Sequence, residues 1–103
     1  MKIYFIYTTF GNLKEAKRIG GQLVKNKLAA CTNIFPTIYS TYVWKNKTVM
    51  DKECSMIVKT SKSKVKVAIK FIVNKHSYEC PAISAFPIES AHMDFKKWIN
   101  EQT

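Results

Sequence analysis

The chain has 103 residues, of which 47% are hydrophobic and 13% aromatic. This content is enough for a folded core and excludes the class of disordered chains, and the length predicts a single domain over residues 1–103. Lysine and arginine total 17 against 7 acids, which gives a net charge of +10 and raises the question of an anionic partner.

The composition of the basic excess argues against a nucleic-acid site. Arg18 is the only arginine, whereas arginine is the usual side chain for reading base edges and for bidentate phosphate binding. The lysines are scattered along the chain, and the densest group consists of Lys59, Lys62, Lys64, Lys66 and Lys70. We therefore expect a solvated basic surface and no nucleic-acid partner.

The sequence carries no signal for a membrane or for secretion. No stretch approaches the roughly 18 apolar residues of a membrane span, and Met1–Phe10 has no small-residue cleavage site. The cysteines are odd in number and lack the C-x-x-C spacing of a zinc knuckle: Cys31, Cys54 and Cys80. We expect reduced thiols and a cytoplasmic protein.

The first quarter of the chain predicts a strand followed by a helix. Lys2–Thr9 is rich in β-branched and aromatic residues, which favour a strand. Asn12 and Glu15 have the spacing of a capping box, and apolar residues then recur at helical spacing to about Asn26. The Gly20-Gly21 pair inside this helix indicates either a closely packed neighbour or a weak helix.

The middle of the chain predicts a long β-hairpin. Leu28–Val43 is extended, and Pro36 within it indicates an edge strand or a bulge. The tip is predicted at Trp44–Lys47, with Val49–Thr60 as the returning strand. A turn centred on Asn46-Lys47 would place Cys54 opposite Tyr39, about 26 Å from Cys31, which argues against a disulfide between these cysteines within one chain.

In the last third of the chain, the sequence pattern does not decide whether one segment is a strand or a helix. Ser63–Lys75 alternates like a strand, yet it also fits the helical i, i+3, i+4 spacing and has an N-cap serine. Pro81–Ile88 reads as a further strand. Ser90 or His92 opens a final helix whose inward residues are predicted to be Phe95, Trp98 and Ile99.

With a helix at Ser63–Lys75, the order of elements predicts an α+β fold. The βαββαβ order is the ferredoxin-like arrangement of an antiparallel sheet with two helices on one face, here with an extra C-terminal helix. The other face needs covering. Aromatic residues near the hairpin tip would be exposed in a monomer, which predicts a homo-oligomer with the tip docked on a neighbour through Tyr39, Tyr42 and Trp44.

Several segments, in order along nearly the whole chain, resemble the CutA divalent-cation tolerance proteins. They are Leu28–Ile34 followed by Pro36 (L-A-A-C-x-N-I-x-P), Ser40, Tyr42 and Trp44 (S-x-Y-x-W), Glu53 with Ile57–Thr60, His76–Pro81 (H-P-Y-E-x-P), and Phe95 with Trp98. Two departures are Ser77, where the family usually has proline, and Asn46, where it usually has glycine.

The resemblance implies a fold, an assembly and a role. It implies a ferredoxin-like homotrimer similar to PII-type signalling proteins, with hairpins that cross subunit boundaries, and it implies that Ser63–Lys75 is a helix. The family role is tolerance to divalent metals, chiefly copper, which implies a metal-responsive binding protein with clefts between subunits.

Candidate metal ligands are Cys31 and His76, with Glu79 or Tyr78 adding an oxygen. Thiolate and imidazole suit copper and zinc, so we expect a copper or zinc ion and no organic cofactor. Each residue also has a structural interpretation, because a free cysteine on an apolar strand is usually packed and a turn histidine is usually hydrogen-bonded.

A second candidate site is a cleft between subunits lined by Lys59 and Tyr78, which could hold a small anionic molecule. No G-x-S-x-G or H-E-x-x-H pattern occurs, and we expect no enzymatic activity. The alternative function is a basic module that binds an acidic partner or nucleic acid through Lys59–Lys75.

Overall fold

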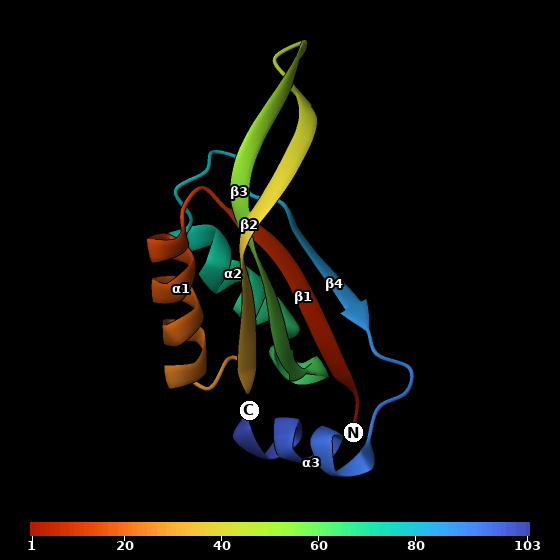
Figure 1. Ribbon diagram of the computed structural model, residues 1–103. Helices are drawn as coiled ribbons and strands as arrows, with labels where there is room; N and C mark the ends of the chain where they lie inside the picture. Colours follow the sequence, from red (N-terminus) through yellow and green to blue (C-terminus); the bar gives the residue numbers. More distant parts are fainter.

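A computed structural model describes all 103 residues and confirms the ferredoxin-like α+β fold with an extra C-terminal helix. The elements are β1 (Ile3–Phe10), α1 (Leu13–Lys25), β2 (Cys31–Trp44), β3 (Lys47–Ser61), the short 3₁₀ helix η1 (Lys62–Lys64), α2 (Val65–Lys75), β4 (Ile83–Pro87) and α3 (Met93–Gln102). The antiparallel strands have the order β2-β3-β1-β4, and α1 and α2 lie on one face of the sheet (Figure 1).

The main core lies between this sheet and the two helices. Alternate strand residues point to opposite faces, so Ile6 and Phe10 of β1 face the helices while Phe5 and Tyr7 face away. The other fully buried members of this core from β3 and both helices are Ala16, Ile19, Leu23, Met56, Val58, Ala68 and Ile72.

Helix α1 has the predicted cap and the predicted close neighbour. The side chain of Asn12 accepts a hydrogen bond from the backbone N–H of Glu15 at 2.8 Å. A Cβ on Gly20 would lie 3.0 Å from the sulfur of Met56, whereas one on Gly21 would meet nothing within 4 Å. Gly20 therefore lets the helix approach β3 closely, and Gly21 faces open space.

The hairpin extends far beyond the sheet (Figure 1), and its turn lies one residue earlier than predicted. Lys45 and Asn46 have positive φ values of 49° and 65°, so they form the turn and Trp44 pairs with Lys47. Tyr39 is consequently opposite Lys52, not opposite Cys54. The predicted irregularity at Pro36 is confirmed, since the register shifts between Phe35 and Ile38 of the edge strand β2.

Helix α2 occupies the segment that pattern alone left open. It begins at Val65 after the 3₁₀ turn, so the serine cap predicted at Ser63 is wrong; Lys64 holds the cap position without a side-chain bond. In α3, Ile99 is buried and Phe95 is half-buried as expected. The predicted inward position of Trp98 is wrong, because 41% of this residue is exposed.

The second face of the sheet is covered at one end only. There α3 packs on β1 in a small cluster of Ile3, Ala30 and Ile99, with Phe5, Ile88 and Phe95 beside it. Elsewhere on the sheet, Phe35 is 47% exposed and Phe86 is 49% exposed. The structure therefore leaves apolar sheet surface uncovered in a single chain. None of the helices combines the length and apolar character that crossing a bilayer requires.

Candidate functional site

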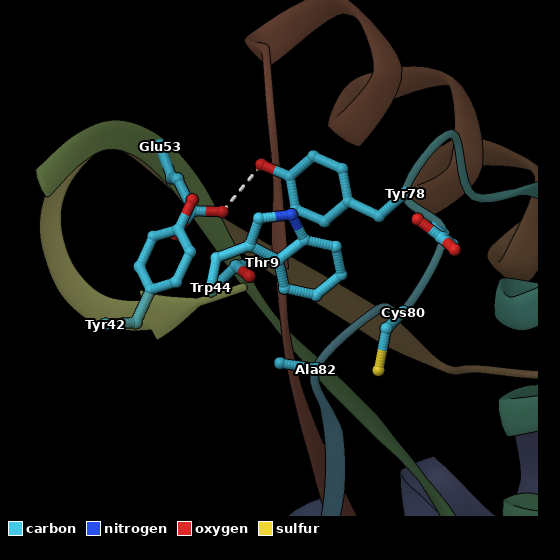
Figure 2. Close-up of a pocket in the computed structure, with 8 residues that line it drawn as sticks. Thr9, Tyr42, Trp44, Glu53, Tyr78, Cys80 and Ala82 are labelled. Atoms are coloured by element: carbon cyan, nitrogen blue, oxygen red, sulfur yellow. Dashed lines mark hydrogen bonds between the residues drawn. The ribbon is translucent and has the colours of Figure 1, made fainter. Parts of the chain in front are cut away.

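A cavity of about 270 Å³ lies where the hairpin leaves the sheet (Figure 2). Its walls come from the end of β1, from both strands of the hairpin and from the loop between α2 and β4. The lining residues are Thr9, Tyr42, Trp44, Glu53, Tyr78, Glu79, Cys80 and Ala82. We call this cavity the hairpin pocket.

The alternation of the hairpin strands directs three of these side chains to one face. Glu53 pairs with Ile38 and Trp44 pairs with Lys47, and directly opposite residues share a face. Tyr42 lies two positions before Trp44, so Tyr42, Trp44 and Glu53 all belong to this pocket face. The outer face of the hairpin carries the alternate positions Tyr39, Thr41, Val43, Met50 and Lys52.

Glu53 and Tyr78 join the hairpin to the α2–β4 loop. The Tyr78 hydroxyl donates a hydrogen bond of 2.6 Å to Oε2 of Glu53, drawn as a dashed line in Figure 2. Glu53 is 9% exposed, and its other carboxylate oxygen has no hydrogen-bond partner in the chain. Burial raises the pKa of Tyr78 well above its ordinary value, and this hydrogen bond is the second largest cause of the increase. The hydroxyl therefore remains a donor.

A second tyrosine–carboxylate pair lies nearby on the hairpin. The Tyr42 hydroxyl donates to Oδ2 of Asp51, and this hydrogen bond raises the pKa of Tyr42. The ion pairs of the chain join Arg18 to Glu15 and His92 to Asp94, and neither lies at the pocket. The carboxylates at and beside the pocket therefore have no basic partner, although the chain has 17 lysines and arginines.

His76 has the structural role that the sequence offered as one of two interpretations. Its ring stacks on Phe10 with centroids 4.7 Å apart. The backbone N–H of Tyr78 donates to Nδ1 at 3.0 Å, so Nε2 carries the proton and donates to the carbonyl of Thr9 at 2.7 Å. Both ring nitrogens are thus occupied, and a metal could bind only after one of these bonds breaks.

The candidate metal ligands do not come together within one chain. Cys31 pairs with Lys59, which pairs with Phe5, whereas His76 contacts Thr9 four residues further along β1. Four residues and two strand spacings separate Cys31 from Thr9 by about 16 Å. No group of three or more histidine, cysteine or acidic side chains could hold a metal ion. A site that uses both Cys31 and His76 would need more than one subunit.

Lys59 and Tyr78 also lie apart in one chain. The Lys59 ammonium lies over the ring of Phe5 at 5.3 Å and that of Phe95 at 5.5 Å, beside α3 on the sheet face away from the other helices. The residues that surround Tyr78 in the hairpin pocket include carboxylates and no lysine. Within the chain, the pocket therefore suits a cation better than the anion that the Lys59 hypothesis required.

A buried acid positions the loop that carries Tyr78. Glu15, 6% exposed, accepts a hydrogen bond from the backbone N–H of Ser77 at 2.8 Å and another from its hydroxyl at 2.9 Å. Proline at this position would supply neither donor. Ser77 therefore holds the loop by hydrogen bonds where the CutA pattern has a rigid ring.

Several pocket residues were not selected as site residues from the sequence. In the sequence, Glu53 stands out only as part of a motif, and Thr9, Cys80 and Ala82 give no signal. One signal was present, because Glu53 and Tyr42 share a face of the hairpin even in the register first predicted. Tyr42 and Trp44, expected only at a subunit interface, face a pocket within the chain itself.

The fold and the pocket define a ferredoxin-like α+β protein with a projecting hairpin. The profile of the CutA1 divalent ion tolerance proteins matches residues 4–102. A divalent-cation tolerance protein CutA of Archaeoglobus fulgidus is 44% identical over 97 residues, which cover 94% of each chain. The chain belongs to the CutA1 divalent ion tolerance protein family.

Solved structures agree with this family membership. The crystal structure of CutA1 from Ehrlichia chaffeensis superposes with a TM-score of 0.94 at 39% identity, covering 99% of this chain and 96% of the other. That of CutA1 from Oryza sativa has a TM-score of 0.96 at 32% identity and covers 100% and 94%. The chain spans about half the length of some relatives, for instance 55% of the chloroplastic rice protein CutA 1.

Proposed function

We propose that this chain acts in divalent-cation tolerance as a cytoplasmic homotrimer that binds copper at a site shared between subunits. It works by binding and not by catalysis. The observation that carries the proposal is the exposed outer face of the hairpin, which a single chain leaves without a partner.

The outer face has the character of a protein interface. Tyr39 is 76% exposed, Val43 71% and Met50 72%, and the strand pairing brings them to one side of the hairpin. Apolar surface of this kind on a projecting element is typical of a subunit contact. The edge strand β2 adds an unpaired row of backbone groups beside it. The pocket face, with Tyr42 and Trp44, remains directed toward its own chain.

The side chains that are free to bind a metal ion support a site shared between subunits. The thiol of Cys31 and the carboxylate of Glu79 make no hydrogen bond in the chain, in contrast to both ring nitrogens of His76. One subunit offers no cluster of three ligands, so further ligands would come from a neighbour. Three unpaired cysteines also suit a reducing compartment such as the cytoplasm.

Native mass spectrometry of the reduced protein, with and without one equivalent of copper per chain, tests the proposal. A mass of about 36 kDa, three chains of 11.9 kDa each, with discrete copper adducts is the expected result. A monomer would refute the interface, and a trimer without specific adducts would refute the metal site.

Matched variants separate the two parts of the proposal. Val43→Glu on the outer face should dissociate the trimer, whereas Thr37→Glu at the exposed bulge serves as a charge control. Cys31→Ser should lower copper uptake, with the exposed Cys80 changed to serine as its control. Equal loss in both cysteine variants would indicate unspecific thiol binding and count against the site.

A second candidate function is favoured by the charge of the helix layer. Ten basic residues are carried by α1, η1, α2 and the residues that follow α1: Lys14, Lys17, Arg18, Lys25, Lys27, Lys62, Lys64, Lys66, Lys70 and Lys75. Glu15 is the one acid there, and it is buried. This basic helix layer could bind nucleic acid through phosphates. Lys59, once grouped with it, faces the opposite side of the sheet.

Binding to an unrelated RNA and DNA at several salt concentrations tests this second function. The expected result is sequence-independent binding that weakens steeply with salt. The double variant Lys66→Glu, Lys70→Glu should abolish it, while Lys45→Glu with Lys47→Glu at the hairpin tip should retain it. Absence of binding at low salt would rule the function out.

A further inference from the structure

We propose that the hairpin pocket binds a small organic ammonium cation, held by the carboxylate of Glu53 and the aromatic rings of Tyr42, Trp44 and Tyr78. This inference depends on the pocket within one chain. The pocket shares Glu79 with the copper ligands proposed above, but it is separate from the proposed trimer contact, which uses the outer face of the hairpin.

Glu53 is the first reason. It is about nine-tenths buried, lines the cavity and accepts one hydrogen bond, from Tyr78, which leaves its second oxygen without a donor. That oxygen is not fully enclosed, so a ligand in the cavity can reach it, and a largely buried carboxylate is stabilised by a paired cation. No lysine, arginine or histidine forms an ion pair with it. A ligand that brings a positive charge and an N–H group would supply the missing partner.

The aromatic lining is the second reason. Figure 2 shows the rings of Tyr42, Trp44 and Tyr78 gathered beside the carboxylate of Glu53. The faces of such rings attract cations, and proteins commonly recognise alkylammonium groups with a cluster of aromatic rings. Aliphatic carbons of the ligand would pack against the same rings.

The wider charge distribution is the third reason. Glu79 also lines the pocket, and Asp51 lies on the same hairpin face as Glu53. The chain as a whole has a net charge of +10, but the negative charge at the pocket repels anions that the basic surface attracts. A metal ion is a poorer fit, since no three histidine, cysteine or acidic side chains converge there and the hydroxyls of Tyr42 and Tyr78 already donate to carboxylates.

The size of the cavity sets the size of the ligand. About 270 Å³ accommodates an ammonium group with a chain of a few carbons. The test therefore uses the n-butylammonium ion. 1-Butanol serves as an uncharged probe with the same number of heavy atoms, and tetramethylammonium as a cation without N–H.

The experiment follows the fluorescence of Trp44 in Trp98→Phe protein, with EDTA present so that no metal contributes. The substitution leaves Trp44 as the single tryptophan, and it spares the pocket because Trp98 lies on α3 away from it. Saturable binding of butylammonium is expected, at least ten-fold tighter than that of 1-butanol. Tetramethylammonium should bind more weakly than butylammonium, because it cannot donate to Glu53. Equal binding of butylammonium and 1-butanol would overturn the proposal.

Variants identify the site. Glu53→Gln retains an acceptor for Tyr78 and should weaken butylammonium at least ten-fold with little effect on 1-butanol. Glu101→Gln, an exposed charge change on α3, should have no effect. Equal loss in both variants, or unchanged binding in Glu53→Gln, would overturn the proposal.

A second variant covers the case in which Glu53→Gln fails to fold. Trp44, 42% exposed, tolerates truncation more readily, so Trp44→Leu is tested by ligand-observed NMR and should also lose binding. Unchanged binding there would overturn the proposal. A native mass spectrum of the same samples reports the trimer independently, so a failure of the pocket is distinguishable from a failure of the proposed assembly.

Discussion

Tyr78 donates its hydroxyl hydrogen to Glu53 at 2.6 Å, which ties the loop after α2 to the base of the hairpin, 25 residues away along the chain. The same loop is held from the other side by Glu15, which accepts two hydrogen bonds from Ser77. The hairpin pocket therefore owes its shape to two buried carboxylates that each receive donors from one short loop.

Removal of the Tyr78 hydroxyl should destabilise the protein. Tyr78→Phe leaves the buried carboxylate of Glu53 without its donor, and hydrogen bonds to charged groups contribute about 1.5–3 kcal/mol. Because Tyr78 is only half-buried, we expect a loss of about 1–2 kcal/mol in the free energy of unfolding, measured by urea denaturation. Tyr4→Phe, on β1 outside both the pocket and the outer face of the hairpin, is the control and should change stability by less than about 0.5 kcal/mol.

The free energy of unfolding should fall at alkaline pH because of Tyr78. The pKa of Tyr78 is raised in the folded state above its ordinary value of 10.0, first by burial and then by the bond to Glu53. Above pH 10 the unfolded chain loses this proton while the folded chain retains it, so unfolding becomes more favourable as pH rises. Below pH 10 the contribution is fully present.

Thermal melts across the alkaline range, together with tyrosinate absorbance, measure this effect. Tyr78→Phe should show a shallower alkaline loss of stability than the parent. Identical pH profiles for the two proteins would show that Tyr78 does not carry the effect.

The two adjacent glycines of α1 should respond in opposite ways to alanine. Gly21→Ala adds a methyl group in open space and should stabilise the helix by about 0.5–1 kcal/mol. Gly20→Ala meets Met56 at 3.0 Å and Thr32 at 3.1 Å, and such overpacking costs about 1–3 kcal/mol. Denaturation midpoints should therefore rank Gly21→Ala above the parent and Gly20→Ala below it. The reverse order would contradict the close approach of α1 to β3.

Proline at position 77 should destabilise this chain although the CutA pattern has proline there. Ser77→Pro removes both donors to Glu15, and an unsatisfied buried group of this kind costs about 1–3 kcal/mol. Ser77→Ala keeps the backbone donor and should cost about half as much. Thermal unfolding of the two variants tests the order, and a stabilised Ser77→Pro protein would contradict the role assigned to Glu15.

The sequence pattern predicted the two faces of the hairpin correctly but not the pairing of its strands. Residue alternation correctly assigned Tyr39 and Tyr42 to opposite faces, but the turn was placed one residue late, which shifted each pairing by two positions. A shift of two keeps every side chain on its face, whereas a shift of one would reverse them all. The faces were therefore predictable even though the partners were not. The turn position depends on positive φ at Lys45 and Asn46, and lysine gives no signal for it.

The candidate site was less predictable. Cys31 and His76 have side chains suited to metal binding, yet His76 is fully engaged by Thr9 and Tyr78. The chemistry of a side chain is evident from the sequence, but a hydrogen-bond partner 67 residues away cannot be identified from it. The same reason explains Lys59, whose place over Phe5 and Phe95 depends on how α3 packs against the sheet.

Several features could be read from the sequence alone: the order of the elements, the type of all but Ser63–Lys75, the cap at Asn12, the irregularity at Pro36 and, through its motifs, the family. These features depend on local periodicity and on residues close together along the chain. The shared pocket of Glu53, Tyr78 and Trp44, and the separation of Lys59 from the basic helix layer, could be known only from the folded chain. Those relationships arise from strand register and sheet order, which depend on packing between distant segments and have no local signature.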